Sequence, residues 1–402
     1  MGQYAFVGGV NKQLNQLYTE YGAAVKDPPL VMKSSEHERA WDGFAATSTD
    51  TFYGSTFCNL KLAKYWLDDT SGKNHMRTGD AFRVIAKVGN LTVLQWALEH
   101  KLFPWSKLFE GACSDAAAHG HLDILKWARE KECEWKSTTC FCAARHGHLD
   151  ILKWAHENGC PWDHWTCSAA ASSGHLDILK WARENGCPWN ADTCTEAAKS
   201  GHLQVLKWAR ANGCPWDEKT CRNAAESGHL ELLKWANENG CPWDETTCCA
   251  AALDGHGWDA CTSCGHTAET DHLVVLKWAR ENGCPWNEFT CSFAATGGRL
   301  DILKWARENG CLWDAETCSA AAEGGHLELL KWARANGCPW DETTCMKAAE
   351  GGHFELLKWA RENGCPWDAD TCSAAAEGGH LEILQWAREN GCPEEGQEDE
   401  EW

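Results

Sequence analysis

The sequence predicts an all-α repeat solenoid, and two residue types carry the prediction. Of 402 residues, 26 are Trp and 25 are Cys, and both types recur at a fixed interval. Eleven Trp residues follow Lys or Gln, and most neighbours in this series are 27 residues apart. A second Trp and two Cys recur in the same register. The chain is therefore expected to repeat one 27-residue unit many times.

Each repeat is expected to form two helices, as residues 163–187 illustrate. Asp163 is a typical N-cap residue, and the small residues 166–171 form the first helix, helix A. Residues 175–185 place apolar side chains on one broad stripe and form the second helix, helix B. Gly186 ends this helix in a left-handed conformation, and Pro188 does not allow it to continue. Because isolated helices this short are marginal in water, the pairs must stack and share a core.

The repeats resemble ankyrin repeats, whose pattern is T-P-L-H-x-A-A-x-x-G-H, a Leu/Val-rich helix and G-A-D-V-N. Residues 370–373 stand where T-P-L-H would be, 375–376 and 379–380 match directly, and 364–368 replace G-A-D-V-N. Ankyrin repeats run to about 33 residues, and the missing residues fall between Asp368 and Thr371. The resemblance therefore implies antiparallel helix pairs whose β-hairpin fingers are shortened or absent. The sequence closely resembles the short Trp- and Cys-rich ankyrin-like arrays of algae, oomycetes and giant viruses.

The predicted organisation has three parts. Residues 1–56 form an N-terminal cap, within which residues 4–21 are similar to part of an F-box-like segment. Residues 57–393 form the repeat array, with an insertion at 257–271. Residues 394–402 form an acidic tail that is expected to be disordered, since six of the eight residues 394–401 are acidic.

The periodic Cys, His and Trp residues are interpreted as structural. The two Cys series, seven residues apart as in Cys160 and Cys167, are expected to pack as small apolar side chains between repeats. The His that begins each helix B is expected to hydrogen-bond the turn between helices A and B, a role that the matching ankyrin His implies. Both Trp series, represented by Trp208 on helix B and Trp216 in the loop, are expected to be buried in the core.

The insertion is the one segment with candidate metal chemistry. Cys261 and Cys264 form a Cys-x-x-Cys pair flanked by His256 and His266, a donor set that suits tetrahedral zinc. A loop between helices A and B and translated non-coding sequence are the alternatives. No metal or other cofactor is expected elsewhere in the chain. Because no nucleophile elbow, phosphate-binding loop or paired-carboxylate motif occurs, the protein is expected not to be an enzyme.

Charge and hydropathy restrict the expected partners. The formal net charge is −21 and no basic block interrupts it, so a nucleic-acid backbone or an anionic membrane would be repelled. No apolar stretch reaches the length of a membrane span, and the N-terminus does not resemble a signal peptide. A monomer located in the cytoplasm is the expectation.

Positions that vary between repeats are the candidate recognition surface, because repeated positions build the scaffold. They follow the second Cys of each pair, which lies in helix A as Cys167 does and is called the helix-A Cys. These positions should line one face, which is concave in stacked helical repeats. We expect a protein-binding scaffold. The alternative is a substrate adaptor of a ubiquitin ligase that uses the F-box-like N-terminus. The candidate residues are Phe141, Arg145, His146, Thr195, Glu196, Lys199, Arg222, Asn223, Glu226, Ser292, Phe293, Thr296, Met346, Lys347 and Glu350.

Overall fold

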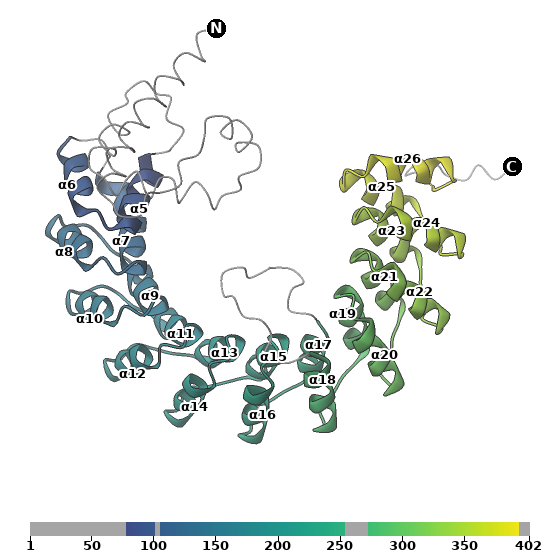
Figure 1. The fold of residues 1–402 in the computed structure, drawn as a ribbon, viewed down its shortest axis with the longest axis horizontal. Helices are drawn as coiled ribbons and strands as arrows, with labels where there is room; N and C mark the ends of the chain where they lie inside the picture. Colours follow the sequence, from purple (N-terminus) through teal and green to yellow (C-terminus); the bar gives the residue numbers. More distant parts are fainter. Residues whose placement is uncertain (1–77, 101–104, 254–271, 394–402) are drawn as a thin grey trace, which may run out of the picture. The chain divides into compact units, whose positions relative to one another are not determined.

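The computed structural model describes residues 78–100, 105–253 and 272–393, which contain 22 helices and no strand (Figure 1). These helices belong to two compact units, divided between Trp162 and Asp163. The predicted all-α class is confirmed for this part of the chain. Because Asp368 caps helix α25 directly, no residues remain there for a β-hairpin finger.

In the first unit, the described residues form three pairs of helices. They are α5 (Thr78–Val88) with α6 (Leu91–Glu99), α7 (Trp105–Ala118) with α8 (Leu122–Glu130), and α9 (Ser137–Arg145) with α10 (Leu149–Glu157). Odd-numbered helices are the predicted helices A, and even-numbered helices are the predicted helices B.

The described part of the second unit forms eight pairs. They are α11 (His164–Ser172) with α12 (Leu176–Glu184), α13 (Ala191–Lys199) with α14 (Leu203–Ala211), α15 (Glu218–Glu226) with α16 (Leu230–Glu238), α17 (Glu245–Ala252) with α18 (His272–Glu281), α19 (Glu288–Thr296) with α20 (Leu300–Glu308), α21 (Ala315–Glu323) with α22 (Leu327–Ala335), α23 (Glu342–Glu350) with α24 (Phe354–Glu362), and α25 (Ala369–Glu377) with α26 (Leu381–Glu389).

Within each unit the helices form two rows (Figure 1). Neighbouring odd-numbered helices lie in close backbone contact, whereas neighbouring even-numbered helices are farther apart. The difference follows from side-chain size, because helices A bury mainly Ala, Cys and Thr, as in the TCSAAA segment of α11. Helices B bury Ile and Leu and carry Trp. Small side chains permit the close approach that makes the A row dense.

The local signals at the helix ends act as predicted. The Asp163 carboxylate accepts a hydrogen bond from the backbone N–H of Trp165 at 3.0 Å and so caps α11. Gly186 follows Asn185, the C-cap residue of α12, and its φ of +83° turns the chain out of the helix. The thiol of Cys187 then donates to the backbone carbonyl of Asp163 at 3.4 Å, which ties successive loops together. The same thiol-to-carbonyl contact recurs from Cys214 to Asn190 and from Cys338 to Asp314.

The periodic His bonds a different turn from the one expected. Instead of its own repeat, the ring reaches the C-terminal end of helix A in the preceding repeat. His326 Nε2 lies 3.0 Å from the carbonyl oxygen of Thr296, and His353 Nε2 lies 2.9 Å from that of Glu323. The interaction supplies a partner for a carbonyl that the helix end leaves unsatisfied. The His series therefore fastens repeats to each other.

The glycine before each of these His residues leaves room for the next ring. Gly325 has φ +73°, and a Cβ built there would lie 2.5 Å from the ring of His353. Gly337 has φ +83°, but nothing lies within 4 Å of its Cβ position. Both positions favour glycine for backbone reasons, and only Gly325 also needs the space.

Replacing Gly325 by Ala should therefore destabilise the array more than replacing Gly337 by Ala. A left-handed Ala costs about 1–2 kcal/mol at either position. At Gly325 the displaced His353 ring should add about 1 kcal/mol, the usual net value of a lost hydrogen bond. Urea unfolding of both variants at pH 7 measures the difference. Equal losses would contradict this role for the His ring.

Several predicted segments lie outside the described residues. They are the cap at 1–56, the first part of the array before residue 78, the insertion at 257–271 and the tail at 394–402. The F-box-like segment at 4–21 belongs to this group. The insertion lies between α17 and α18, which still pack against each other as a pair. His272 of α18 makes the usual bond, with Nε2 3.0 Å from the carbonyl oxygen of Glu226.

Candidate functional site

The twelve main candidate residues all reach the surface of the odd-numbered helices. Arg145, His146, Lys199, Arg222, Phe293 and Glu350 are exposed, whereas Glu196, Asn223, Glu226, Thr296, Met346 and Lys347 are half-buried. Arg145 and His146 belong to the first unit, and the other ten belong to the second. We call the exposed side of the odd-numbered helices the helix-A surface. It comprises the positions two residues before, and two and five residues after, the Cys of each helix A, together with His146, Arg222 and Met346.

Two further candidates are not part of this surface. Thr195 and Ser292, each directly after the helix-A Cys, are 7% and 6% exposed. This position faces the next helix A, where Thr195 Oγ1 lies 3.5 Å from Thr220 Oγ1. The hydroxyl of Ser292 donates to the carbonyl of Phe289 at 3.1 Å. Including them in the recognition surface was wrong, because the close spacing of helices A covers these short side chains, whereas the longer side chain of Arg222 at the same position reaches the surface.

Sequence reasoning missed the position two residues before the helix-A Cys. Trp165 and Phe289 occupy it on α11 and α19, and each is 50% exposed. Lys219 occupies it on α15 and is exposed. The position varies between repeats and lies four residues before the Phe293 position, so helical periodicity was a signal that placed both on one face.

Several candidates make contacts on their own surface. The ammonium of Lys347 lies 2.9 Å from a carboxylate oxygen of Glu350 and 3.3 Å from one of Glu323. The hydrogen bond to Glu350 is the main reason that the pKa of Lys347 is raised. In the first unit, His146 Nδ1 lies 2.9 Å from the carbonyl oxygen of Cys142. Lys347 is therefore held by carboxylates of two helices, α21 and α23. Its ammonium is less available than the Arg222 guanidinium for an ion pair with a binding partner.

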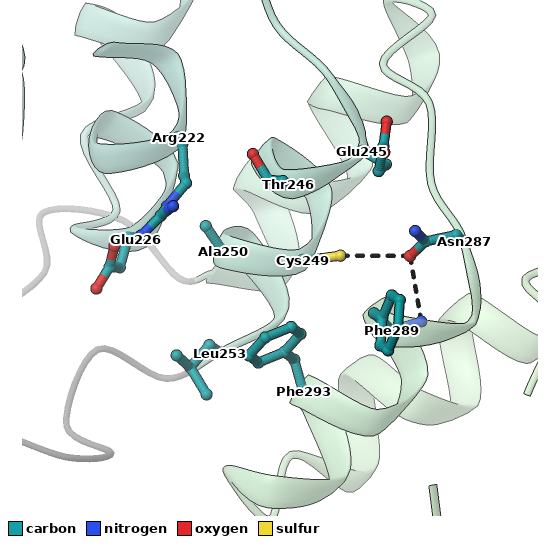
Figure 2. Close-up of a pocket in the computed structure, with 10 residues that line it drawn as sticks. All are labelled: Arg222, Glu226, Glu245, Thr246, Cys249, Ala250, Leu253, Asn287, Phe289 and Phe293. Atoms are coloured by element: carbon teal, nitrogen blue, oxygen red, sulfur yellow. Dashed lines mark hydrogen bonds between the residues drawn. The ribbon is translucent and has the colours of Figure 1, made fainter. Parts of the chain in front are cut away.

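A groove of about 360 Å³ brings three of the candidates together (Figure 2). It lies across α15, α17 and α19, and its lining includes Arg222, Glu226 and Phe293. Figure 2 shows Arg222 and Glu226 on one side, Leu253 and Phe293 on the other, and Ala250 between them. Ala250 is only 8% exposed and forms part of the floor.

The groove exists because small side chains on α17 lie between large ones. Thr246, Cys249 and Ala250 occupy the surface side of α17. The equivalent places on α19 carry Phe289 and Phe293, which are 50% and 38% exposed. Cys249 is fixed below the surface, with its thiol 3.5 Å from the Asn287 side-chain oxygen. The result is an apolar hollow bordered by charge, which is the usual character of a binding site.

The Trp residues are less buried than expected. Among the described loop and helix-B Trp residues of the repeats, only Trp127 and Trp135 are buried, at 7% and 9% exposure. The others are half-buried because Ile, Leu and Ala fill the centre of the helix-B stripe. Trp189 packs edge-on against Trp208 with ring centroids 6.0 Å apart, and the Arg183 guanidinium lies 4.1 Å above Trp189. The Trp residues thus pack against each other between adjacent repeats, but they do so at the edge of the core and not in its centre.

The predicted burial of the periodic Cys is confirmed, but the thiols in contact are not those seven residues apart. Cys113 and Cys133 have sulfur atoms 4.0 Å apart, and the spacing of 20 residues recurs in Cys194 with Cys214. Each such pair joins helix A to the loop after helix B of the same repeat. Of the 22 described Cys residues, all free thiols, Cys142 is the one that is not buried.

The described residues offer no candidate metal centre. Among residues 78–100, 105–253 and 272–393, no group of three or more His, Cys, Asp or Glu side chains is placed to hold an ion. His256, Cys261, Cys264 and His266 lie outside these ranges, so the zinc hypothesis stays a prediction. Within the same ranges, no helix has the length and apolar character needed to cross a membrane.

Comparison with known proteins identifies the repeat. The family model described as "Ankyrin repeats (many copies)" matches residues 113–156 and 140–183. No curated protein matches the chain.

Two solved structures of one helical-repeat protein are similar to the chain. One is the pentatricopeptide repeat protein PPR10 from maize, at 14% identity over 93% of this chain and 63% of that chain, with a TM-score of 0.34. The other is PPR10 in complex with an 18-nt psaJ RNA element, at 14% identity over 87% and 66%, with a TM-score of 0.26. The chain thus spans less than two thirds of the length of these structures. It carries ankyrin repeats, identified over residues 113–183 and continued by helix pairs of the same register up to Pro393.

Proposed function

We propose that this protein is a non-enzymatic scaffold that binds a protein partner on the helix-A surface of its second unit. Ankyrin repeats in a helical solenoid are typical of binding proteins rather than enzymes. The observation that carries the proposal is the groove. Arg222 and Glu226 on α15 lie 67 to 71 residues before Phe293 on α19, and only the stacking of repeats brings these side chains together. The close spacing of the odd-numbered helices supports placing this surface on the concave side of the stack in the second unit.

The net charge supports a protein over a nucleic acid as the partner. At −21, the chain would repel a phosphate backbone, and the helix-A surface has no run of basic residues to offset that repulsion. Exposed Phe289 and Phe293 beside charged residues instead resemble the apolar anchors and polar rim of protein interfaces.

Affinity purification tests the proposal. The intact chain should recover specific proteins, and a variant with Arg222, Phe293 and Lys347 changed to Ala should lose them. Truncating residues of this kind at an interface costs about 1–4 kcal/mol each when they are central to binding. Circular dichroism of the variant should match the parent, because all three side chains lie on the surface.

A matched control removes the same number of positive charges and one exposed apolar side chain on the even-numbered helices and loops. Lys234, Lys331 and the 68% exposed Leu312 changed to Ala provide it. This variant should keep the partners. Equal loss in both variants, or no specific protein recovered with the intact chain, would contradict a site on the helix-A surface.

A further inference from the structure

We propose that the groove across α15, α17 and α19 accepts a bulky apolar side chain of a basic peptide, whose Lys and Arg residues extend over α19–α25. This inference rests on the proposed function and adds the chemistry of the partner. Two separate features carry it, the apolar groove and the charge of the surface beside it.

The groove itself selects an apolar side chain. Its floor and one wall are made by Ala250, Leu253, Phe289 and Phe293, and its volume of about 360 Å³ is near the lower end of ligand pockets. The two Phe rings are partly exposed, at 50% and 38%. Burying them against an aliphatic or aromatic side chain would remove apolar surface from water, at about 25 cal/mol per Å².

The surface beside the groove selects the charge of the peptide. On α17, α19, α21, α23 and α25 the only basic residue is Lys347, which is already paired with Glu323 and Glu350. The acidic residues on these helices are exposed or half-buried. They are Glu245, Glu288, Glu316, Glu323, Glu342, Glu350, Asp370 and Glu377. These carboxylates give the odd-numbered helices on this side of the groove a net negative charge, here called the negative strip.

The opposite side of the groove carries mixed charge, because Glu218 and Glu226 on α15 and Asp192 and Glu196 on α13 lie among its basic residues. This difference from the α19–α25 side gives the peptide a direction. Lys219 and Arg222 lie on α15, and Lys199 lies on α13. A basic segment would gain less attraction there than over α19–α25. The apolar residue should therefore occupy the groove at one end of the peptide, with the basic residues following toward α25.

Other occupants fit the charges less well. A second copy of this chain, at net charge −21, would meet the negative strip with like charge. Residues 254–271, which follow Leu253 in sequence, contain Asp254, Asp259, Glu269 and Asp271 and no Lys or Arg. A nucleic acid would be repelled by the same carboxylates.

Fluorescence anisotropy with labelled synthetic peptides on the full chain tests the inference. The probe carries adjoining Leu and Phe followed by a run of Lys and Arg. One control peptide replaces Leu and Phe by Ser, and the other replaces the basic residues by Glu. The probe should bind more tightly than both, and its affinity should fall as salt is raised from about 0.05 M to about 0.3 M.

Variants then separate the two features. Ala250→Leu fills the floor of the groove and should weaken probe binding by about tenfold or more, in line with loss of one interface anchor. Glu288, Glu316 and Glu342 changed to Gln should weaken it several-fold and reduce its salt dependence. The matched control changes Glu328, Glu355 and Glu382 to Gln on even-numbered helices and should leave affinity within about twofold.

Four results would overturn the inference. They are equal binding of a control peptide, no effect of Ala250→Leu, equal effects of the two sets of Gln variants, and probe binding that appears only after residues 255–270 are deleted. The last would mean that this segment of the chain occupies the groove. The scaffold proposal is tested separately. It would stand even if the basic peptide did not bind, provided that the intact chain captures proteins which the Arg222, Phe293 and Lys347 variant loses.

Discussion

Raising the pH from 9 to 11 should unfold the repeat array, because folding holds one thiol of most Cys pairs in the protonated form. The pKa of the partner is lowered in some pairs, as for Cys214. In pairs such as Cys194 with Cys214, the hydrogen bond to the partner sulfur and burial raise the pKa of one thiol. Burial, as the larger cause, raises the pKa of Cys249 to about 11 and that of Cys392 to about 12. Thiols of the unfolded chain ionise near pH 8.5.

The direction of the effect follows from proton binding. Above pH 9 the unfolded chain loses thiol protons that the folded chain keeps, so each further pH unit favours the unfolded state by about 1.4 kcal/mol for each retained proton. A thiol with a raised pKa occurs in repeat after repeat, as in Cys221, Cys248, Cys291 and Cys345. A typical domain has only about 5–15 kcal/mol of stability, so the combined effect should exceed it.

Urea unfolding at a series of pH values, under reducing conditions and constant ionic strength, measures this effect. The matched variant changes Cys194 and Cys214 to Ala. It should be less stable at pH 7, but its stability should fall less steeply between pH 9 and 10.5, by about 1.4 kcal/mol per pH unit. The same slope in variant and parent would show that these thiols do not retain protons in the folded state.

Changing Leu303 to Ala should lower the free energy of unfolding by about 2–5 kcal/mol, the range for truncating a buried Leu. Leu303 lies on α20 and is 0% exposed, as is the adjacent Ile302. The loss combines the transfer free energy of the removed atoms with the cost of the cavity that stacked repeats are unable to close. Neighbouring repeats depend on this packing, so the effect should reach beyond α20.

Leu312 provides the matched control for the same substitution. It stands in the loop after α20, where most repeats have Pro, and is 68% exposed. Leu312→Ala should change stability by no more than about 0.5 kcal/mol. Urea unfolding at neutral pH compares the two variants. Similar losses would mean that helix B does not form the core of the array.

Much of the fold was predictable because its signals lie within one repeat. The Asp163 cap, the apolar stripe ending before Asn185 and the positive φ of Gly186 all act over a few residues. The sequence therefore determined the helix pairs, their boundaries to within one or two residues, and the stacking that short amphipathic helices require. It also determined that the residues after the helix-A Cys vary between repeats, and so which face is the candidate recognition surface.

Only the tertiary structure decided which side chains contact each other between helices. The thiols in contact are 20 residues apart, and His326 reaches a carbonyl 30 residues earlier. Thr195 is covered although it varies, because helices A approach closely, and Trp208 stays half-buried because smaller side chains fill the centre of its stripe. The groove likewise depends on small side chains of α17 lying between larger ones of α15 and α19. These contacts depend on distances between helices that stacking sets, and the helical periodicity within one repeat does not predict such distances.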